Sequence, residues 1–257
     1  ARFASFGGGK KVAVPRITAG TSASWLTEGS PPASGTNPEL DKVILDPKTL
    51  AAYVVVTRAM LASAGPDLEA WLLADLAGAV GSAIDAAALN GAGGDQPTGV
   101  LQNTDVPVAL LGADGGAPTR ATLIAMAKTV ANANGDASAT PRLGWATSPD
   151  GEAKLRSIDG STGNAGRWLW DSTGVLDRPA VASTSIPSDL TKGDGEDLTA
   201  LVYGDWGQLL INLPTTMDVI VNPHTIAPDL RVTVLMDVAA AVRRPTSFVK
   251  TVDMATS

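Results

Sequence analysis

Residues 67–90 read DLEAWLLADLAGAVGSAIDAAALN and carry the strongest helix pattern in the chain. Pro66 and Asp67 are typical of a helix start, and Asn90 followed by Gly91 is typical of a helix end. Apolar residues recur every three or four positions, which places them on one face. These residues are Leu68, Trp71, Leu72, Leu76, Val80, Ile84 and Ala87. The pattern predicts a helix roughly 36 Å long, with Trp71 in the core.

The residues before this helix are expected to form an arm and a long hairpin. Residues 1–21 are rich in glycine and small side chains, and residues 25–38 concentrate Pro, Gly and Ser. Residues 42–47 and 49–57 are strongly β-prone. We therefore predict a two-stranded hairpin with a mobile tip within residues 22–58. Such a hairpin is marginal alone and needs another surface to be stable.

The residues after the helix predict an α+β protein. Thr119 is expected to cap a helix over residues 120–133, with Leu123, Ile124, Ala127 and Val130 facing inward. Ser148 and Pro149 are expected to start a third helix, because Ser suits the cap and Pro the first helical position. The remaining β-prone segments are residues 143–147, 200–203, 208–213, 218–221, 231–242 and 247–252.

Composition and charge exclude several classes of function. The net charge of -7 argues against a protein that grips nucleic acid through its phosphates. The absence of cysteine excludes disulfides, thiolate metal sites and a cysteine nucleophile. By the sequence, no segment approaches the run of about 20 apolar residues that a membrane span needs, so we expect no membrane association.

No motif in the sequence indicates catalysis, a cofactor or a metal. The only histidine, His224, lies in a predicted loop, and there is no Gly-x-Ser-x-Gly elbow. The glycines at 7–9 and 91–94 do not complete a phosphate or dinucleotide loop. Residues 159–164 lack the ligands of a calcium loop. A small hydrolase or ligand-binding domain is kept as a remote alternative without motif support.

The paired tryptophans Trp168 and Trp170 suggest a contact surface. We expect that in an extended segment these two indoles do not both face one way. One indole is therefore expected to be exposed or buried against a neighbour, as aromatic side chains often are at interfaces. The alternative is that the same chain covers both.

The order of arm, hairpin, long helix, mixed lobe and final β segment resembles the major capsid proteins of tailed bacteriophages, which share the Hong Kong 97 fold. The resemblance covers nearly the whole chain. It is carried by residues 25–29, 42–61, 85–91, 97–101, 147–149, 155–156, 201–206 and 244–250. Each segment is degenerate alone, and their shared order is specific.

The resemblance implies a domain division. Residues 1–21 would be an N-terminal arm, and residues 22–58 an extended loop that reaches across a neighbouring subunit. Residues 59–118 would form a peripheral domain with a spine helix at 67–90. Residues 119–222 would be an axial domain at capsomer centres, and residues 223–257 would return to the peripheral domain.

The resemblance also implies the function. The chain would assemble into hexamers and pentamers of an icosahedral shell around phage DNA, without sequence-specific DNA binding. Its partners would be itself, a portal protein, a maturation protease and a decoration protein. It would reside in the virion after assembly in the host bacterial cytoplasm. The start at Ala1 without a leader would reflect a scaffolding segment removed by the protease. A cell-encoded compartment or gene transfer particle of the same fold is the nearest alternative.

The inter-subunit contacts are expected on the hairpin, its base and the tryptophan pair. The residues are Trp25, Glu28, Asp41, Lys42, Lys48, Arg58, Trp168 and Trp170. For each charge, ordinary solvated surface is the alternative. Some relatives join a hairpin lysine to an asparagine of a neighbour, with a glutamate nearby. Lys42 lies where such a lysine could be, but residues 229–244 hold neither Asn nor Glu, so we expect no cross-links.

Overall fold

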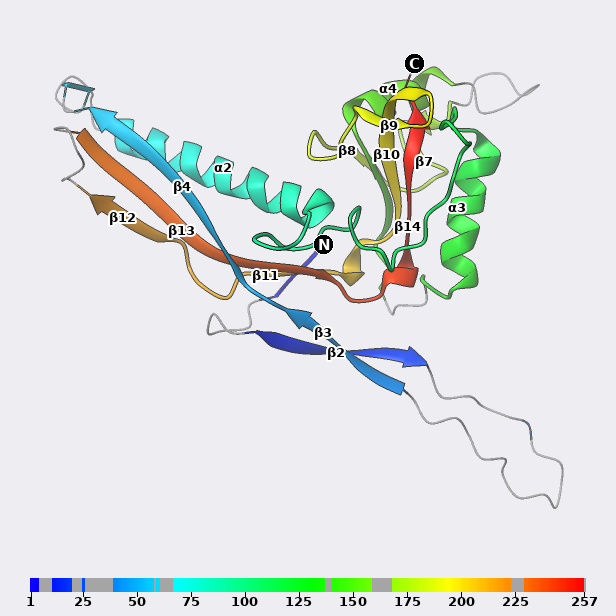
Figure 1. The fold of residues 1–257 in the computed structure, drawn as a ribbon, viewed down its shortest axis with the longest axis horizontal. Helices are drawn as coiled ribbons and strands as arrows, with labels where there is room; N and C mark the ends of the chain where they lie inside the picture. The colour runs from blue at the N-terminus through cyan, green and yellow to red at the C-terminus, as the bar shows by residue number, and fades with distance from the viewer. Residues whose placement is uncertain are drawn as a thin grey trace.

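The computed structural model describes residues 1–4, 11–19, 25, 39–57, 59–60, 67–136, 140–158, 168–222 and 229–256. Figure 1 shows an elongated lobe, a compact lobe that contains the C-terminus, and a ribbon that projects away from both. Each lobe is built on its own β-sheet, and the ribbon is a pair of antiparallel strands.

The predicted long helix is present as α2 (Asp67–Asn90). Leu72, Leu76 and Val80 are buried on the elongated sheet, as the periodicity predicts. The placement of Trp71 in the core is wrong, because its side chain is 62% exposed. At about 100° per residue, Trp71 points about 140° away from Leu76 and misses the sheet.

The outer sides of α2 are apolar and uncovered. Residues 70–90 have a mean hydropathy of 1.5, and 22% of that window is buried. By length and composition this helix could cross a membrane, so the expectation that no segment approaches a span is wrong for α2. Core helices of soluble proteins have the same length and composition. Helix α2 packs on its own chain along one side, through Leu76 and Val80.

The elongated sheet is organised by one long strand, β13 (Asp229–Val242). On one side it pairs with ten residues of β4 (Lys48–Thr57). Along its other edge, residues 231–235 pair with β12 (Asp218–Asn222) and residues 239–242 pair with β11 (Leu209–Asn212). The short β1 (Arg2–Ala4) adds to β11 in parallel. Because α2 packs on β4 and β13, this sheet has one covered face and one open face.

The hairpin differs from its predicted boundaries. Its strands are β2 (Val12–Ala19) and β3 (Glu39–Leu45), paired from Val12 with Leu45 to Ala19 with Glu39. The first strand therefore comes from the segment predicted to be an arm, and β4 belongs to the sheet. The β-prone run of β4 is drawn there by its long pairing with β13 and by burial of alternate residues under α2. The predicted mobile tip lies outside the described residues.

The compact lobe has a sheet ordered β14 (Phe248–Ala255), β10 (Gly195–Asp205), β5 (Leu143–Thr147) and β8 (Ala180–Ala182), with β9 (Leu190–Lys192) also on β10. The short pair β6 (Trp170–Asp171) and β7 (Gly174–Val175) lies beside it, and 3-10 turns cover residues 206–208 and 245–247.

Both predicted helix starts of this lobe are confirmed. Thr119 caps α3 (Arg120–Asn132), and Ser148 caps α4 (Pro149–Ser157) with Pro149 in the first turn. Ile124 was expected inside but is 48% exposed, and Met126 is buried in its place.

Strand pairing cuts across the expected domain limits. Residues 223–257 do not form one set of returning strands, because β13 lies in the elongated sheet and β14 in the compact one. Likewise β11 and β12, expected in the axial segment 119–222, pair with β13. The chain therefore crosses between lobes more often than a linear division allows.

One buried lysine connects the two lobes. Lys250 of β14 donates hydrogen bonds from Nζ to the carbonyl oxygens of Leu101 at 2.6 Å and Asn103 at 2.8 Å. These carbonyls belong to the segment that follows α2. Burial lowers the pKa of Lys250 because the charged ammonium loses water. The charge is compensated by these two main-chain carbonyl dipoles.

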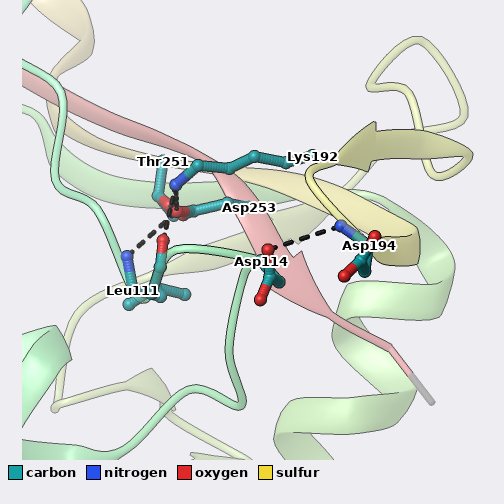
Figure 2. Close-up of polar contacts among 7 residues, drawn as sticks. Leu111, Asp114, Lys192, Asp194, Thr251 and Asp253 are labelled. Carbon is teal, nitrogen blue, oxygen red and sulfur yellow. Dashed lines mark hydrogen bonds and ion pairs between the residues drawn. The ribbon is translucent and has the colours of Figure 1, made fainter.

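A second buried polar group closes the end of the compact sheet (Figure 2). The carboxylate of Asp253 is fully buried and lies 2.6 Å from Lys192 Nζ. It also accepts hydrogen bonds from the hydroxyl of Thr251 and the amide of Leu111. Its desolvation would raise the pKa, but these donors outweigh that effect and hold the pKa of Asp253 below its usual value.

We predict that Asp253→Asn lowers the free energy of unfolding at pH 7 by about 2 to 4 kcal/mol, because Lys192 loses its carboxylate partner. Since the folded-state pKa is lowered, this stabilisation is present above about pH 4 and is lost as the pH falls through the folded-state value. Urea unfolding at pH 7 and pH 3 measures both effects. The exposed Asp95→Asn serves as control, and an equal loss in both variants would contradict the prediction.

Candidate functional site

The β2–β3 ribbon is fixed to the molecule by one of its two faces. Leu45, fully buried, packs with Leu210 and Ala239 of the elongated sheet. Val12 and Val14 pack against the same cluster. Alternation along a strand sends the neighbouring side chains to the other face. The ribbon is therefore anchored at its base, and its second face points away from the sheet.

The second face of the ribbon is an exposed apolar strip. Ile17, Leu40 and Ile44 are 60%, 71% and 54% exposed. The register places Ile17 opposite Leu40 and Ala13 opposite Ile44, with Pro15 opposite Lys42 between them. We name these six residues the hairpin strip. An apolar surface on a projecting ribbon favours a binding role, since nothing in the described chain covers it.

Of the predicted charged contacts, Asp41 and Lys42 lie on opposite faces of the ribbon, and Lys48 lies at the start of β4. Asp41 pairs with Arg16 of its own chain at 2.6 Å, and Lys48 lies 3.4 Å from Asp46. A backbone hydrogen bond at Lys42 and the Arg16 side chain lower the pKa of Asp41. Such exposed pairs contribute little to stability, about 0 to 1 kcal/mol. Lys42 alone of the three lies within the hairpin strip.

The other predicted contact residues fall into different environments. Trp25 is fully exposed, at 103%. Glu28 and Arg58 lie outside the described residues. Trp168 is 49% exposed, whereas Trp170 is 6% exposed and packs in the core of the compact lobe below Arg156. The indole of Trp168 is therefore partly exposed to solvent. The indole of Trp170 is buried by other residues of the same chain.

The open face of the elongated sheet is a second apolar surface, which the sequence analysis missed. Tyr53, Val55 and Ile220 are 61%, 47% and 50% exposed. The register aligns Tyr53, Thr233 and Ile220 in one row across three strands. Arg231 stacks over Tyr53 with 4.1 Å between its guanidinium carbon and the ring centroid. Alternation in residues 49–57 was the available signal, but it does not tell which face a helix covers.

A metal site or a ligand cavity would be the sign of chemistry in the described residues. No three His, Cys, Asp or Glu side chains in this part of the chain come together as a metal site. An apolar cavity of about 720 Å³ lies between the end of α2 and strands β5 and β8. Asp85, Arg142 and Arg178 are the charged side chains on its wall. His224 lies outside the described residues.

An anchored ribbon, a one-sided sheet and extended apolar surfaces are typical of a structural protein that associates with other copies. Comparison with known proteins agrees with this class. A model of the phage capsid family matches residues 2–253, so the chain belongs to the phage capsid family. Members of this family are structural capsid proteins and not enzymes.

The chain is 29% identical over 243 residues to the major capsid protein of Halomonas phage phiHAP-1. The match covers 92% of this chain and 37% of that protein. The chain therefore spans little more than a third of the length of this curated relative.

Solved structures share the fold. The capsid of an empty GTA particle has a TM-score of 0.80 at 19% identity, over 99% of this chain and 88% of that one. Gordonia phage Cozz gives a TM-score of 0.67 at 18% identity, over 98% and 83%. The SrpI encapsulin of Synechococcus elongatus PCC 7942 gives 0.66 at 13% identity, over 99% and 85%. These likenesses confirm the predicted α+β capsid fold.

We predict that Leu45→Ala loosens the base of the ribbon, at a cost of about 2 to 4 kcal/mol, because it opens a cavity beside Leu210. Amide hydrogen exchange of residues 12–19 and 39–45 is expected to rise, while the compact lobe stays protected. Ile44→Ala is the matched control, since its exposed side chain points the other way. Equal exchange in the two variants would refute the anchoring role.

Proposed function

We propose that this chain self-assembles into the hexamers and pentamers of an icosahedral shell that encloses phage DNA. The observation that carries the proposal is the hairpin strip, an apolar surface on a ribbon anchored only at its base. A two-stranded ribbon needs a further surface to be stable along its length. A neighbouring copy in a shell supplies that surface at every position.

In this proposal the hairpin strip of one subunit lies on the open face of the elongated sheet of the next. Both surfaces are apolar and exposed, and their burial favours association. Lys42 in the strip is opposite in charge to Asp218 and Asp237, which border the open face. Trp25 and the predicted contacts Glu28 and Arg58 lie near the ribbon in sequence and would extend the same interface.

We further propose roles for the two lobes. The elongated lobe with α2 acts as the peripheral domain, and the compact lobe with Trp168 on its surface acts as the axial domain. The limits of both follow the sheets and not the linear ranges predicted from the sequence. The hydrogen bonds of Lys250 support a fixed angle between them.

The surroundings of the shell follow from the family and the charge. A net charge of -7 suits a wall beside packed DNA that does not bind it through phosphates. A portal protein, a maturation protease and a decoration protein are the proposed partners. The proposed location is the virion, after assembly in the bacterial cytoplasm.

A gene transfer particle or a cell-encoded compartment is the second candidate, because structures of both kinds share the fold. Cargo separates the candidates. Packaged DNA and a cut N-terminus favour a virus, and an enclosed enzyme with an intact N-terminus favours a compartment.

Electron microscopy of the purified protein tests assembly. We expect closed shells or capsomers for the natural sequence, and none for Leu40→Asp, which places a charge in the hairpin strip. The subunit of this variant is expected to keep its stability within about 0.5 kcal/mol, because the site is exposed. Leu110→Asp, at a 69% exposed position of the compact lobe, is the control. Normal shells from Leu40→Asp would count against the interface.

We also propose that the contacts are noncovalent. Residues 229–244 contain neither the asparagine nor the glutamate of the cross-linking relatives. Mature particles boiled in detergent are therefore expected to run as one band at the mass of the chain. A ladder of covalent oligomers on the gel is the contrary result.

A further inference from the structure

Strand β12 (Asp218–Asn222) is an unprotected edge of the elongated sheet. Its five residues pair regularly with residues 231–235 of β13, and no described strand pairs with its other side. Val219, Ile220 and Val221 are 45%, 50% and 54% exposed. At the centre of this strand, residues 219–221 are thus exposed on both faces, and no described strand covers their outer edge. This geometry recruits another strand.

Two other edge strands carry features that oppose pairing. Strand β2 contains Pro15 and Arg16 and has an irregular register near its end. Strand β8 has only three residues. Proline, charge, irregular register and short length are usual protections of an edge. The sequence of β12, Asp-Val-Ile-Val-Asn, has none of them at its centre.

We infer that β12 pairs antiparallel with β12 of a second copy of the chain. This inference rests on the proposed function, since it needs copies that associate. A two-fold axis through Ile220 places Ile220 opposite its counterpart and Val219 opposite the partner's Val221. It also places Asp218 opposite the partner's Asn222. The contact joins the two sheets into one.

Charge selects this arrangement. A parallel pairing in register would set Asp218 beside the partner's Asp218, and like charges directly opposite are destabilising. The antiparallel pairing separates the two carboxylates to opposite ends. Because each copy offers the same strand, the interface is isologous and closes after two subunits, so it does not propagate as a fibre. A two-fold contact between subunits of neighbouring capsomers fits such an interface.

A single cysteine tests the contact directly, because the chain has none of its own. In assembled particles of Ile220→Cys, we expect most chains to become dimers after oxidation or treatment with a short bismaleimide, as seen on a nonreducing gel. Val181→Cys, at a 62% exposed position of edge strand β8, is expected to stay monomeric. Unlinked chains in Ile220→Cys particles, or equal linking in both variants, would overturn the inference.

A charge swap provides a second measurement that does not depend on thiol geometry. Ile220→Lys and Ile220→Glu are each expected to raise the protein concentration needed for assembly at least about fivefold, because like charges meet at the axis. An equimolar mixture is expected to return toward the natural value. A mixture no better than either variant would refute the pairing.

These results separate the two proposals. If the natural chain forms particles but the Ile220→Cys variant is not linked, the pairing of β12 fails and the shell function stands. If the natural chain forms no particles, the shell function fails and the pairing fails with it.

Discussion

The structure depends on β13, a strand of 14 residues that is hydrogen-bonded on both sides. Ten of its residues pair with β4, while β11 and β12 share its other edge. This pairing creates a sheet long enough to receive α2 along one face. It also places β11 and Ala239 where the ribbon is anchored through Leu45. Ribbon, helix and open face are thus all positioned by one strand.

The lobes share an apolar cluster, in which Val202 and Phe248 of the compact sheet pack with Ile211 and Val238 of the elongated sheet. The hydrogen bonds of Lys250 add direction to this contact. An apolar contact tolerates sliding, whereas the two hydrogen bonds of Lys250 are satisfied only in one arrangement. The cost of burying an ammonium is visible in the lowered pKa of Lys250. A shell subunit benefits from such a joint, because a small error in angle would be repeated at every position of a closed surface.

Among the described residues, exposed apolar side chains gather on the hairpin strip, the open face of the sheet, β12 and the outer sides of α2. Burial on its own core explains the inner sides of β4 and α2, but it leaves Ile17, Tyr53 and Ile220 in water. For an isolated molecule this distribution is a liability to aggregation. In the proposed shell the same residues would be buried between subunits, which fits the phage capsid family.

The sequence determined the local features. The period of residues 67–90 gave α2 to within its observed ends, and Thr119, Ser148 and Pro149 marked two helix starts, because caps and periodicity act over a few residues. The order of segments sufficed to predict the capsid fold. Only the tertiary structure decided that β4 joins β13, that β14 joins β10, and that Trp71 faces outward. Strand partners far apart in sequence are chosen by competition for hydrogen bonds and burial across the whole chain, which no local pattern records.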